Sequence, residues 1–167
     1  MLAVERSYLA EPNHVIAFSA WPGDECEIAN LRLALYPDKM ETEAAILPTG
    51  LKGWKWQSFC KTQFASNPDV GGMANFVRCH LALIRLLDRT KAMGILENVK
   101  DEGGYWENRD LKTLVETVGR WNAQLAGLVG QFKDEFGGNI IAPITEFPNF
   151  EHLEAEGRKG ELDDPQS

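Results

Sequence analysis

The sequence predicts an α+β domain, in which a mainly antiparallel sheet of four to six strands is followed by two long amphipathic helices packed on one face. Two observations lead to this prediction. Short apolar or alternating segments occupy the chain before residue 65, and long segments with helical periodicity follow residue 72. At 167 residues the chain has the length of one ordinary domain. We therefore expect a single domain over residues 1–156 and a disordered acidic tail over residues 157–167.

Two strands are predicted near the N-terminus. Residues 14–21 are a short apolar run that ends at a Pro-Gly pair. Residues 29–35 follow the two-residue period of a strand, in which every second side chain points to the same face. That face holds Leu31, Leu33 and Leu35. A helix over residues 24–35 is the alternative, because Asp24 could cap it, and we favour the strand.

Two further strands are predicted before residue 65. Residues 42–47 form the weaker one, which ends at Pro48. Residues 54–64 form the clearer one, because they alternate along their length as a strand does when one face lies on the core. The face expected to point inward holds Trp54, Trp56, Ser58, Cys60, Thr62 and Phe64. Cys60 is therefore expected to face the interior.

The first long helix is predicted from about Met73 to Met93. Gly94 follows it at the position favoured for a left-handed C-terminal cap. Its apolar stripe has helical spacing and consists of Phe76, His80, Leu83, Ile84 and Leu87. This stripe predicts that His80 is buried.

The second long helix is predicted from Asn108 or Asp110, either of which can cap it, to Phe136. Asn122 lies in its stripe of leucines, valines and phenylalanines. Three glycines interrupt this helix, and each weakens it by about 1 kcal/mol relative to alanine. We therefore expect them where the helix packs closely against the sheet or the first helix. Short edge strands are weaker expectations at residues 95–100 and 140–142.

Composition and charge argue against two classes of partner. The formal net charge of −8 and the isoelectric point near 4.9 disfavour nucleic acid, because phosphate contacts need clustered lysines and arginines. Half of this charge lies in residues 151–167, so the rest of the chain is only mildly acidic. Three charges interrupt the most apolar helix, which argues against a membrane span: Arg78, Arg85 and Asp88.

A cytoplasmic location is expected on two grounds. The first twelve residues lack the continuous apolar run of a secretory signal. The cysteines, Cys26, Cys60 and Cys79, are odd in number and irregularly spaced, which fits reduced thiols better than a disulfide framework.

The most suggestive polar residues are Cys60, His80 and Asn122, each within an apolar stripe on a different element. A buried polar group left unpaired costs about 1 to 3 kcal/mol, so each should have a partner. These three types are the nucleophile, the general base and the base-orienting residue of a thiol hydrolase. A cysteine-dependent hydrolase is therefore one alternative. The other is structural, because a reactive thiol is favoured at a helix start rather than in mid-strand.

A second alternative is an acid-base or metal site before the second long helix. Asp101, Glu102 and Glu107 bracket the sequence Gly-Gly-Tyr-Trp, with His14 or His152 as further candidates. Paired carboxylates can transfer protons or hold a hard cation. Acids also favour the start of a helix for its dipole alone. The sequence contains no HxxxH, HExxH or CxxC spacing, so we assign no metal ligand.

Aromatic residues at strand starts and turns are the candidates for ligand binding. Tryptophans gathered at one end of a sheet can hold a planar or apolar ligand or anchor a protein interface. They can equally fill the core. The candidate ligand-binding residues are Trp54, Trp56, Glu102, Tyr105, Trp106 and Glu107.

The leading expectation is a non-catalytic domain that binds a small molecule or a protein and is able to form a homo-oligomer. The nucleotide motifs GxGxxG and GxxxxGK[ST] do not occur in the sequence. The two Gly-Gly pairs, at residues 71–72 and 103–104, are expected to serve turns. No cofactor is expected.

Overall fold

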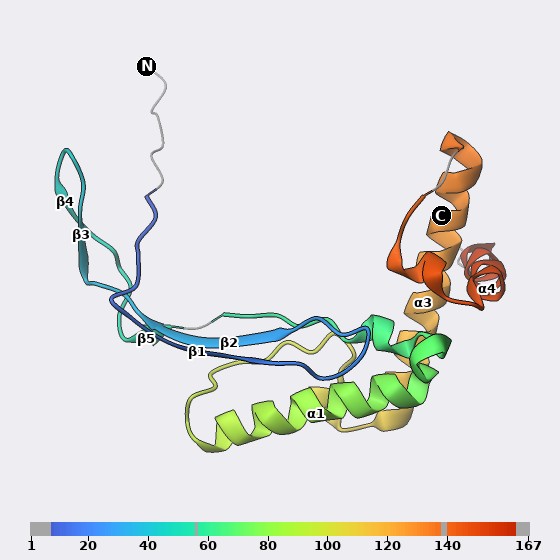
Figure 1. The fold of residues 1–167 in the computed structure, drawn as a ribbon, viewed down its shortest axis with the longest axis horizontal. Helices are drawn as coiled ribbons and strands as arrows, with labels where there is room; N and C mark the ends of the chain where they lie inside the picture. The colour runs from blue at the N-terminus through green and yellow to red at the C-terminus, as the bar shows by residue number, and fades with distance from the viewer. Residues whose placement is uncertain (1–7, 56, 138–139, 163–167) are drawn as a thin grey trace. The chain divides into compact units, whose positions relative to one another are not determined.

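The computed structural model describes residues 8–55, 57–137 and 140–162. The chain forms two compact units, and each is described by itself. The first comprises Met1–Trp21 and Ile28–Cys60, and the second comprises Pro22–Glu27 and Lys61–Ser167. In the described residues, the strands belong to the first unit and the α-helices to the second (Figure 1). The single domain expected over residues 1–156 stays a prediction.

The first unit consists of two antiparallel sheets. The larger one has the strand order β1-β2-β5, with β1 at His14–Ala20, β2 at Ala29–Leu35 and β5 at Trp54–Lys55. The smaller one pairs β3, Lys39–Glu41, with β4, Ile46–Pro48. The prediction of antiparallel sheets in a mixed α+β chain is confirmed, but the larger sheet has three described strands rather than four to six. The strand at residues 29–35 is confirmed, and the alternative helix over residues 24–35 is wrong.

β1 and β2 form a continuous antiparallel ribbon (Figure 1). Ile16 lies opposite Leu33, and Phe18 lies opposite Leu31. Because side chains alternate between the two faces of a strand, these four residues share one face of the ribbon. Leu31 is buried, whereas Ile16 and Phe18 remain more than half exposed.

The long strand predicted at residues 54–64 is wrong over residues 57–64. Of the residues in this segment that the structure describes, only Trp54–Lys55 pairs with β2, and a 3-10 helix, η1, occupies Gln63–Ser66. Ser58 gives a physical reason, because its hydroxyl donates a hydrogen bond to the carbonyl oxygen of Asn30 in β2. A side chain thus occupies an acceptor that a continuing strand would use for its backbone. Trp56 lies outside the described residues.

The predicted strand at residues 42–47 is also displaced. β3 ends at Glu41 and β4 begins at Ile46, and the residues between them form the connecting turn. Thr42 closes that turn, because its backbone N–H donates to the carbonyl oxygen of Ala45 at 2.9 Å and its hydroxyl donates to the same oxygen at 2.7 Å.

The second unit contains the two long helices that the sequence predicts. α1 spans Gly72–Ala92, and Gly94 follows it with a φ of +73°. α3 spans Leu111–Phe136 and is capped by Asp110, whose carboxylate accepts from the backbone N–H groups of Lys112 and Thr113. Their packing on one face of the sheet concerns both units and stays a prediction.

Several shorter elements complete the second unit. These are η2 at Pro68–Val70, α2 at Tyr105–Asn108, η3 at Pro143–Glu146 and α4 at Phe150–Leu162. Residues 95–100 and 140–142 form no strand, so both edge-strand expectations are wrong. Residues 157–162, expected in the disordered tail, are the last turns of α4. Among the described helices, none is long and apolar enough to cross a membrane.

The predicted close packing of the α3 glycines is explained by α4, not by the sheet or the first helix. α4 lies beside α3 (Figure 1). A Cβ at Gly127 would lie 3.0 Å from the carbonyl carbon of Gly157. A Cβ at Gly130 would overlap the carboxylate of Glu154, whereas one at Gly119 would meet no atom within 4 Å. Two of the three glycines therefore allow the close approach of α4.

The second unit also includes a segment from between β1 and β2. Residues 22–27 leave the first unit, and Cys26 packs against a core formed by Ala65, Phe76, Cys79, Leu114 and Val118. The backbone of Glu27 donates to the carbonyl oxygen of Lys61 at 2.9 Å. A Cβ at Gly23 would lie 2.6 Å from the sulfur of Cys79. The segment is therefore an integral part of the second unit.

Candidate functional site

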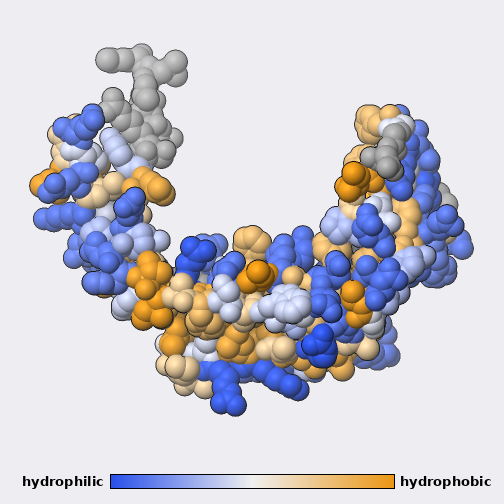
Figure 2. All heavy atoms as spheres, in the orientation of Figure 1, coloured by the Kyte–Doolittle hydropathy of each residue, from blue (hydrophilic) through white to orange (hydrophobic). Residues whose placement is uncertain are grey.

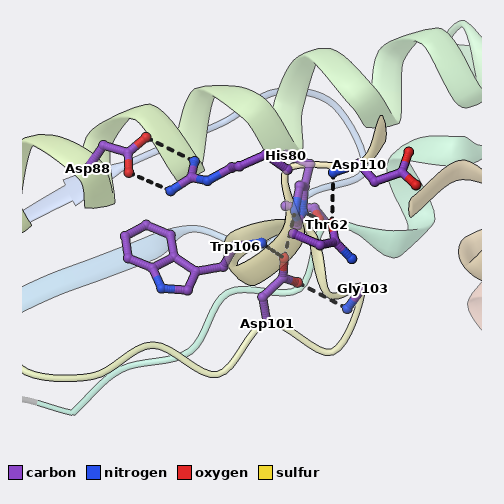
Figure 3. A network of polar contacts seen from close by, with 9 residues as sticks. Thr62, His80, Asp88, Asp101, Gly103, Trp106 and Asp110 are labelled. Atoms are coloured by element: carbon purple, nitrogen blue, oxygen red, sulfur yellow. Dashed lines mark hydrogen bonds and ion pairs between the residues drawn. The ribbon is translucent and has the colours of Figure 1, made fainter. Parts of the chain in front are cut away.

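A buried polar network in the second unit has His80 at its centre (Figure 3). His80 lies midway along α1 and is 8% exposed. Its Nδ1 atom is 3.3 Å from the hydroxyl oxygen of Thr62, and its Nε2 atom is 3.4 Å from Oδ2 of Asp101. The second contact has the separation of an ion pair but lacks hydrogen-bond geometry. The ring of Phe76 and the edge of Tyr105 enclose the imidazole, with ring centroids at 5.5 and 6.1 Å.

Asp101 connects this network to the start of α2. Its Oδ1 atom accepts from the backbone N–H of Gly103 at 3.0 Å, and its Oδ2 atom accepts from the backbone N–H of Trp106 at 2.9 Å. Burial raises the pKa of the Asp101 carboxyl, but the His80 side chain and the two backbone N–H groups outweigh it and hold the pKa below its ordinary 3.8. Asp101 is therefore ionised at neutral pH and fixes the turn that leads into α2.

Both ring nitrogens of His80 are directed at protein groups. The tautomer of the ring decides whether Nδ1 or the Thr62 hydroxyl is the donor of the contact between them. Nδ1 thus lies within hydrogen-bond distance of a protein hydroxyl, whereas Nε2 faces the Asp101 carboxylate without forming a hydrogen bond. This arrangement suits a structural role better than proton exchange with a substrate.

Asn122 belongs to a separate set of bonds between α3 and η1. Its Oδ1 atom accepts from the side-chain amide of Gln63 at 3.0 Å, and its Nδ2 atom donates to the Ser66 hydroxyl at 2.8 Å. The Ser66 hydroxyl in turn donates to the carbonyl oxygen of Gln63 at 2.6 Å. Asn122 is 4% exposed, and both polar atoms of its amide have a protein partner.

The inward orientation predicted for His80 and Asn122 is confirmed, but their partners differ from those the sequence suggests. His80 faces Thr62 and Asp101, and Asn122 bonds to η1. Cys60 is half-buried and belongs to the first unit. The cysteine hydrolase therefore stays a prediction. Thr62 was not a site candidate, although its place on the predicted inward face was a signal for it.

Trp106 is the aromatic residue that this network positions. Two cationic side chains lie over its indole ring, with the Arg109 guanidinium 4.8 Å and the Lys91 ammonium 5.3 Å from the ring centroid. Arg109 forms two hydrogen bonds to Asp88, at 3.0 and 2.7 Å (Figure 3). Arg109 also adopts a φ of +57°, which costs a non-glycine residue free energy, and the bonds to Asp88 help to hold it there.

A surface pocket adjoins the Trp106 ring. It combines apolar and polar groups from the end of α1, the segment after it and α2. Its lining consists of Lys91, Leu96, Glu97, Asn98, Val99 and Trp106. The sequence predicts Trp106 as a ligand-binding residue but does not single out residues 96–99, because they form neither a helix nor a strand.

Of the other predicted ligand-binding residues, the described ones are not among those that line this pocket. Trp54 is 45% exposed in β5, and Tyr105 packs against His80. Glu102 is exposed, with its carboxylate 3.9 Å from the Lys100 ammonium, and Glu107 is also exposed.

The three carboxylates proposed for the acid-base or metal site, those of Asp101, Glu102 and Glu107, do not form a cluster. The Asp101 carboxylate is engaged by His80 and the backbone, whereas those of Glu102 and Glu107 face solvent. Within the ranges that the structure describes, no three His, Cys, Asp or Glu side chains gather to hold a metal ion.

A comparison with protein-family models, curated proteins and solved structures finds no match to this chain. Function is therefore inferred from the geometry of these side chains.

Proposed function

We propose that this protein is a non-catalytic binding domain whose ligand, a small planar molecule bearing a carboxylate, docks on Trp106. The observation that carries this proposal is that Trp106 lines a surface pocket while its backbone N–H is bonded to the Asp101 carboxylate. Pockets that combine aromatic walls with a few polar groups are the usual form of small-molecule sites.

The fixed position of Trp106 supports binding. α2 has only four residues, which is too short to be stable by itself. The Asp101 carboxylate accepts a hydrogen bond from the backbone N–H of Trp106 in this helix, and the same carboxylate lies 3.4 Å from Nε2 of His80. An aromatic side chain that is ordered before the ligand arrives loses less conformational entropy on binding. In this proposal, the buried polar network orders Trp106 for binding and takes no part in catalysis.

The lining of the pocket indicates the class of ligand. Leu96, Val99 and Trp106 are among the lining residues of a pocket whose accessible surface is mostly polar, and an aromatic ring prefers planar partners. The Lys91 ammonium lies over the indole at 5.3 Å. Such an exposed cation–π contact is worth only about 0.5–1 kcal/mol, so Lys91 can be displaced at little cost. A carboxylate on the ligand would then pair with the displaced ammonium.

The proposal is tested by thermal shift and calorimetric titration with indole-3-acetate and its neutral amide, indole-3-acetamide. We expect saturable stabilisation by the acid and a weaker response to the amide. Trp106→Ala should abolish the response, and Lys91→Ala should remove the difference between the two compounds. Trp54→Ala is the matched control, because it removes a partly exposed tryptophan of the other unit. No response to the acid, or an undiminished response in Trp106→Ala, refutes the proposal.

The hydrolase alternative makes a different prediction for the thiol of Cys60. A nucleophilic cysteine needs a base that can take its proton, whereas the ring nitrogens of His80 face Thr62 and Asp101. We therefore expect slow alkylation of Cys60 by iodoacetamide at neutral pH. Alkylation much faster than that of an unstructured thiol would favour the hydrolase instead.

A further inference from the structure

Among the described strands, β1 lies at the edge of the larger sheet. In the described part of the chain it pairs with β2 alone, since the sheet order is β1-β2-β5. Along a strand, backbone N–H and C=O groups alternate in direction, so half of those in β1 point away from the sheet. Such a row of unpaired groups is a template for another strand.

The sequence of β1 lacks the features that usually protect an edge. Natural edge strands carry charged residues, proline or a bulge. His14–Ala20 has no Lys, Arg, Asp, Glu or Pro, and its register with β2 runs unbroken through all seven residues. Three apolar side chains of β1 are more than half exposed: Val15 at 52%, Ile16 at 59% and Phe18 at 53%. Figure 2 shows hydrophobic side chains at the surface along the β1–β2 ribbon.

We infer that a second copy of this chain covers this edge, through antiparallel pairing of β1 with β1 of the partner copy. The strand is self-complementary about Ala17. With a two-fold axis at that residue, Ile16 of one copy faces Phe18 of the other, and Val15 faces Ser19. The pair of Ile16 with Phe18 is of the β-branched–aromatic kind that stabilises antiparallel ladders. The symmetry is that of a closed dimer, so the pairing does not propagate into a fibre.

The same pairing extends the apolar face of the ribbon. Ile16 and Phe18 share a face with Leu33 and Leu31 of β2. Joining two copies at β1 places these faces side by side in one sheet of six strands. The proposal is independent of the Trp106 pocket, because its residues belong to the first unit and the pocket belongs to the second.

The dimer should be weak and dependent on salt. A single pair of seven-residue strands buries less surface than a standard protein interface, so we expect dissociation on the order of 10–100 µM. Each copy carries a net charge of −8, and the two copies repel each other. Salt screens this repulsion and should strengthen the dimer.

Sedimentation equilibrium from about 5 to about 300 µM, a range that spans the expected dissociation constant, tests the inference. The mass should rise from 18.7 kDa toward twice that value. Ile16→Lys should hold the protein at the monomer mass, because it places a charge on the paired edge. Ile46→Lys is the matched control, since Ile46 is 63% exposed in the separate β3–β4 hairpin. Circular dichroism verifies that each variant folds.

Cysteine cross-linking tests the register. In the proposed pairing Ala17 faces its own copy, so Ala17→Cys should form a disulfide-linked dimer under mild oxidation. Ser19→Cys is the control, because the two introduced sulfurs would be separated along the strands by about 14 Å. A strict monomer at all concentrations, dimers that persist in Ile16→Lys, or equal cross-linking of the two cysteine variants would each overturn the inference.

Discussion

The close contact between α3 and α4 predicts that Gly157→Ala destabilises the protein. Gly157 lies on the face of α4 that meets α3. A Cβ there would overlap the carbonyl oxygen of Ala123 and lie 3.1 Å from the Cα of Gly127. Both neighbours are backbone atoms, so no side-chain rotation can relieve the overlap. The two helices must separate locally to accept the methyl group.

Two opposing effects set the magnitude. Alanine is favoured over glycine within a helix by about 1 kcal/mol. Forcing an extra methyl into a closely packed contact costs about 1–3 kcal/mol, and rigid backbone neighbours favour the upper part of that range. The net change is a destabilisation of about 1–2 kcal/mol. For a chain of this length this corresponds to a fall in Tm of about 2–8 °C.

Gly160 provides the matched control, because it lies three residues further along the same helix and a Cβ there meets no atom within 4 Å. Gly160→Ala should therefore leave stability unchanged or raise it by up to about 1 kcal/mol. Urea unfolding followed by far-ultraviolet circular dichroism measures both variants. The reasoning is refuted if Gly157→Ala unfolds at the same or higher urea concentration than the wild type.

Three further predictions concern single side chains of the second unit. Because the pKa of Asp101 is lowered on folding, its ionised carboxylate stabilises the fold above about pH 4, and this stabilisation is lost as the pH falls through the lowered value. The urea midpoint of Asp101→Asn should therefore converge on that of the wild type in acid. A constant difference between the two midpoints down to low pH would contradict this. Asp110→Ala should lower the free energy of unfolding by about 1 kcal/mol because it removes the cap of α3, with Asp110→Asn close to wild type in the same urea titration. Cys79 is fully buried, so mass spectrometry after thiol labelling should find it modified only in denaturant, and its modification in native buffer would count against the described core.

The elements that the sequence predicts well have strong local signals. The Asp110 cap and the glycines after each long helix place the ends of α1 and α3 within a residue or two. The alternating leucines of residues 29–35 likewise identify β2. In each case the information lies in side chains that are close in sequence to the backbone they control.

The elements that it misses depend on distant partners. Residues 54–64 alternate like a strand, but a strand also needs a neighbour for its backbone, and Ser58 takes one of the available acceptors with its hydroxyl. The sequence of α4 by itself is a weak signal for a helix, because it is highly charged and contains two glycines. One of those glycines becomes favourable only when α3 presents its own glycines opposite it. α2 similarly depends on the buried carboxylate of Asp101.

The candidate site shows the same division. Helical spacing predicts that His80 and Asn122 are buried, and a buried polar group implies a partner. The identities of the partners, Thr62 and Asp101 for one and Gln63 and Ser66 for the other, depend on how the helices and η1 meet. The spacing of residues along the sequence does not determine that arrangement.

The excursion of residues 22–27 into the second unit has a practical consequence for dissecting the protein. The chain passes between the two units at three points, after residues 21, 27 and 60. A protease that cuts one of these points leaves the other two connections intact. A fragment that starts at Lys61 would lack Gly23, which lies against Cys79, and Cys26, which packs on the hydrophobic core. Part of that core would then be exposed to solvent. The helical half can therefore be isolated only if those six residues are supplied with it.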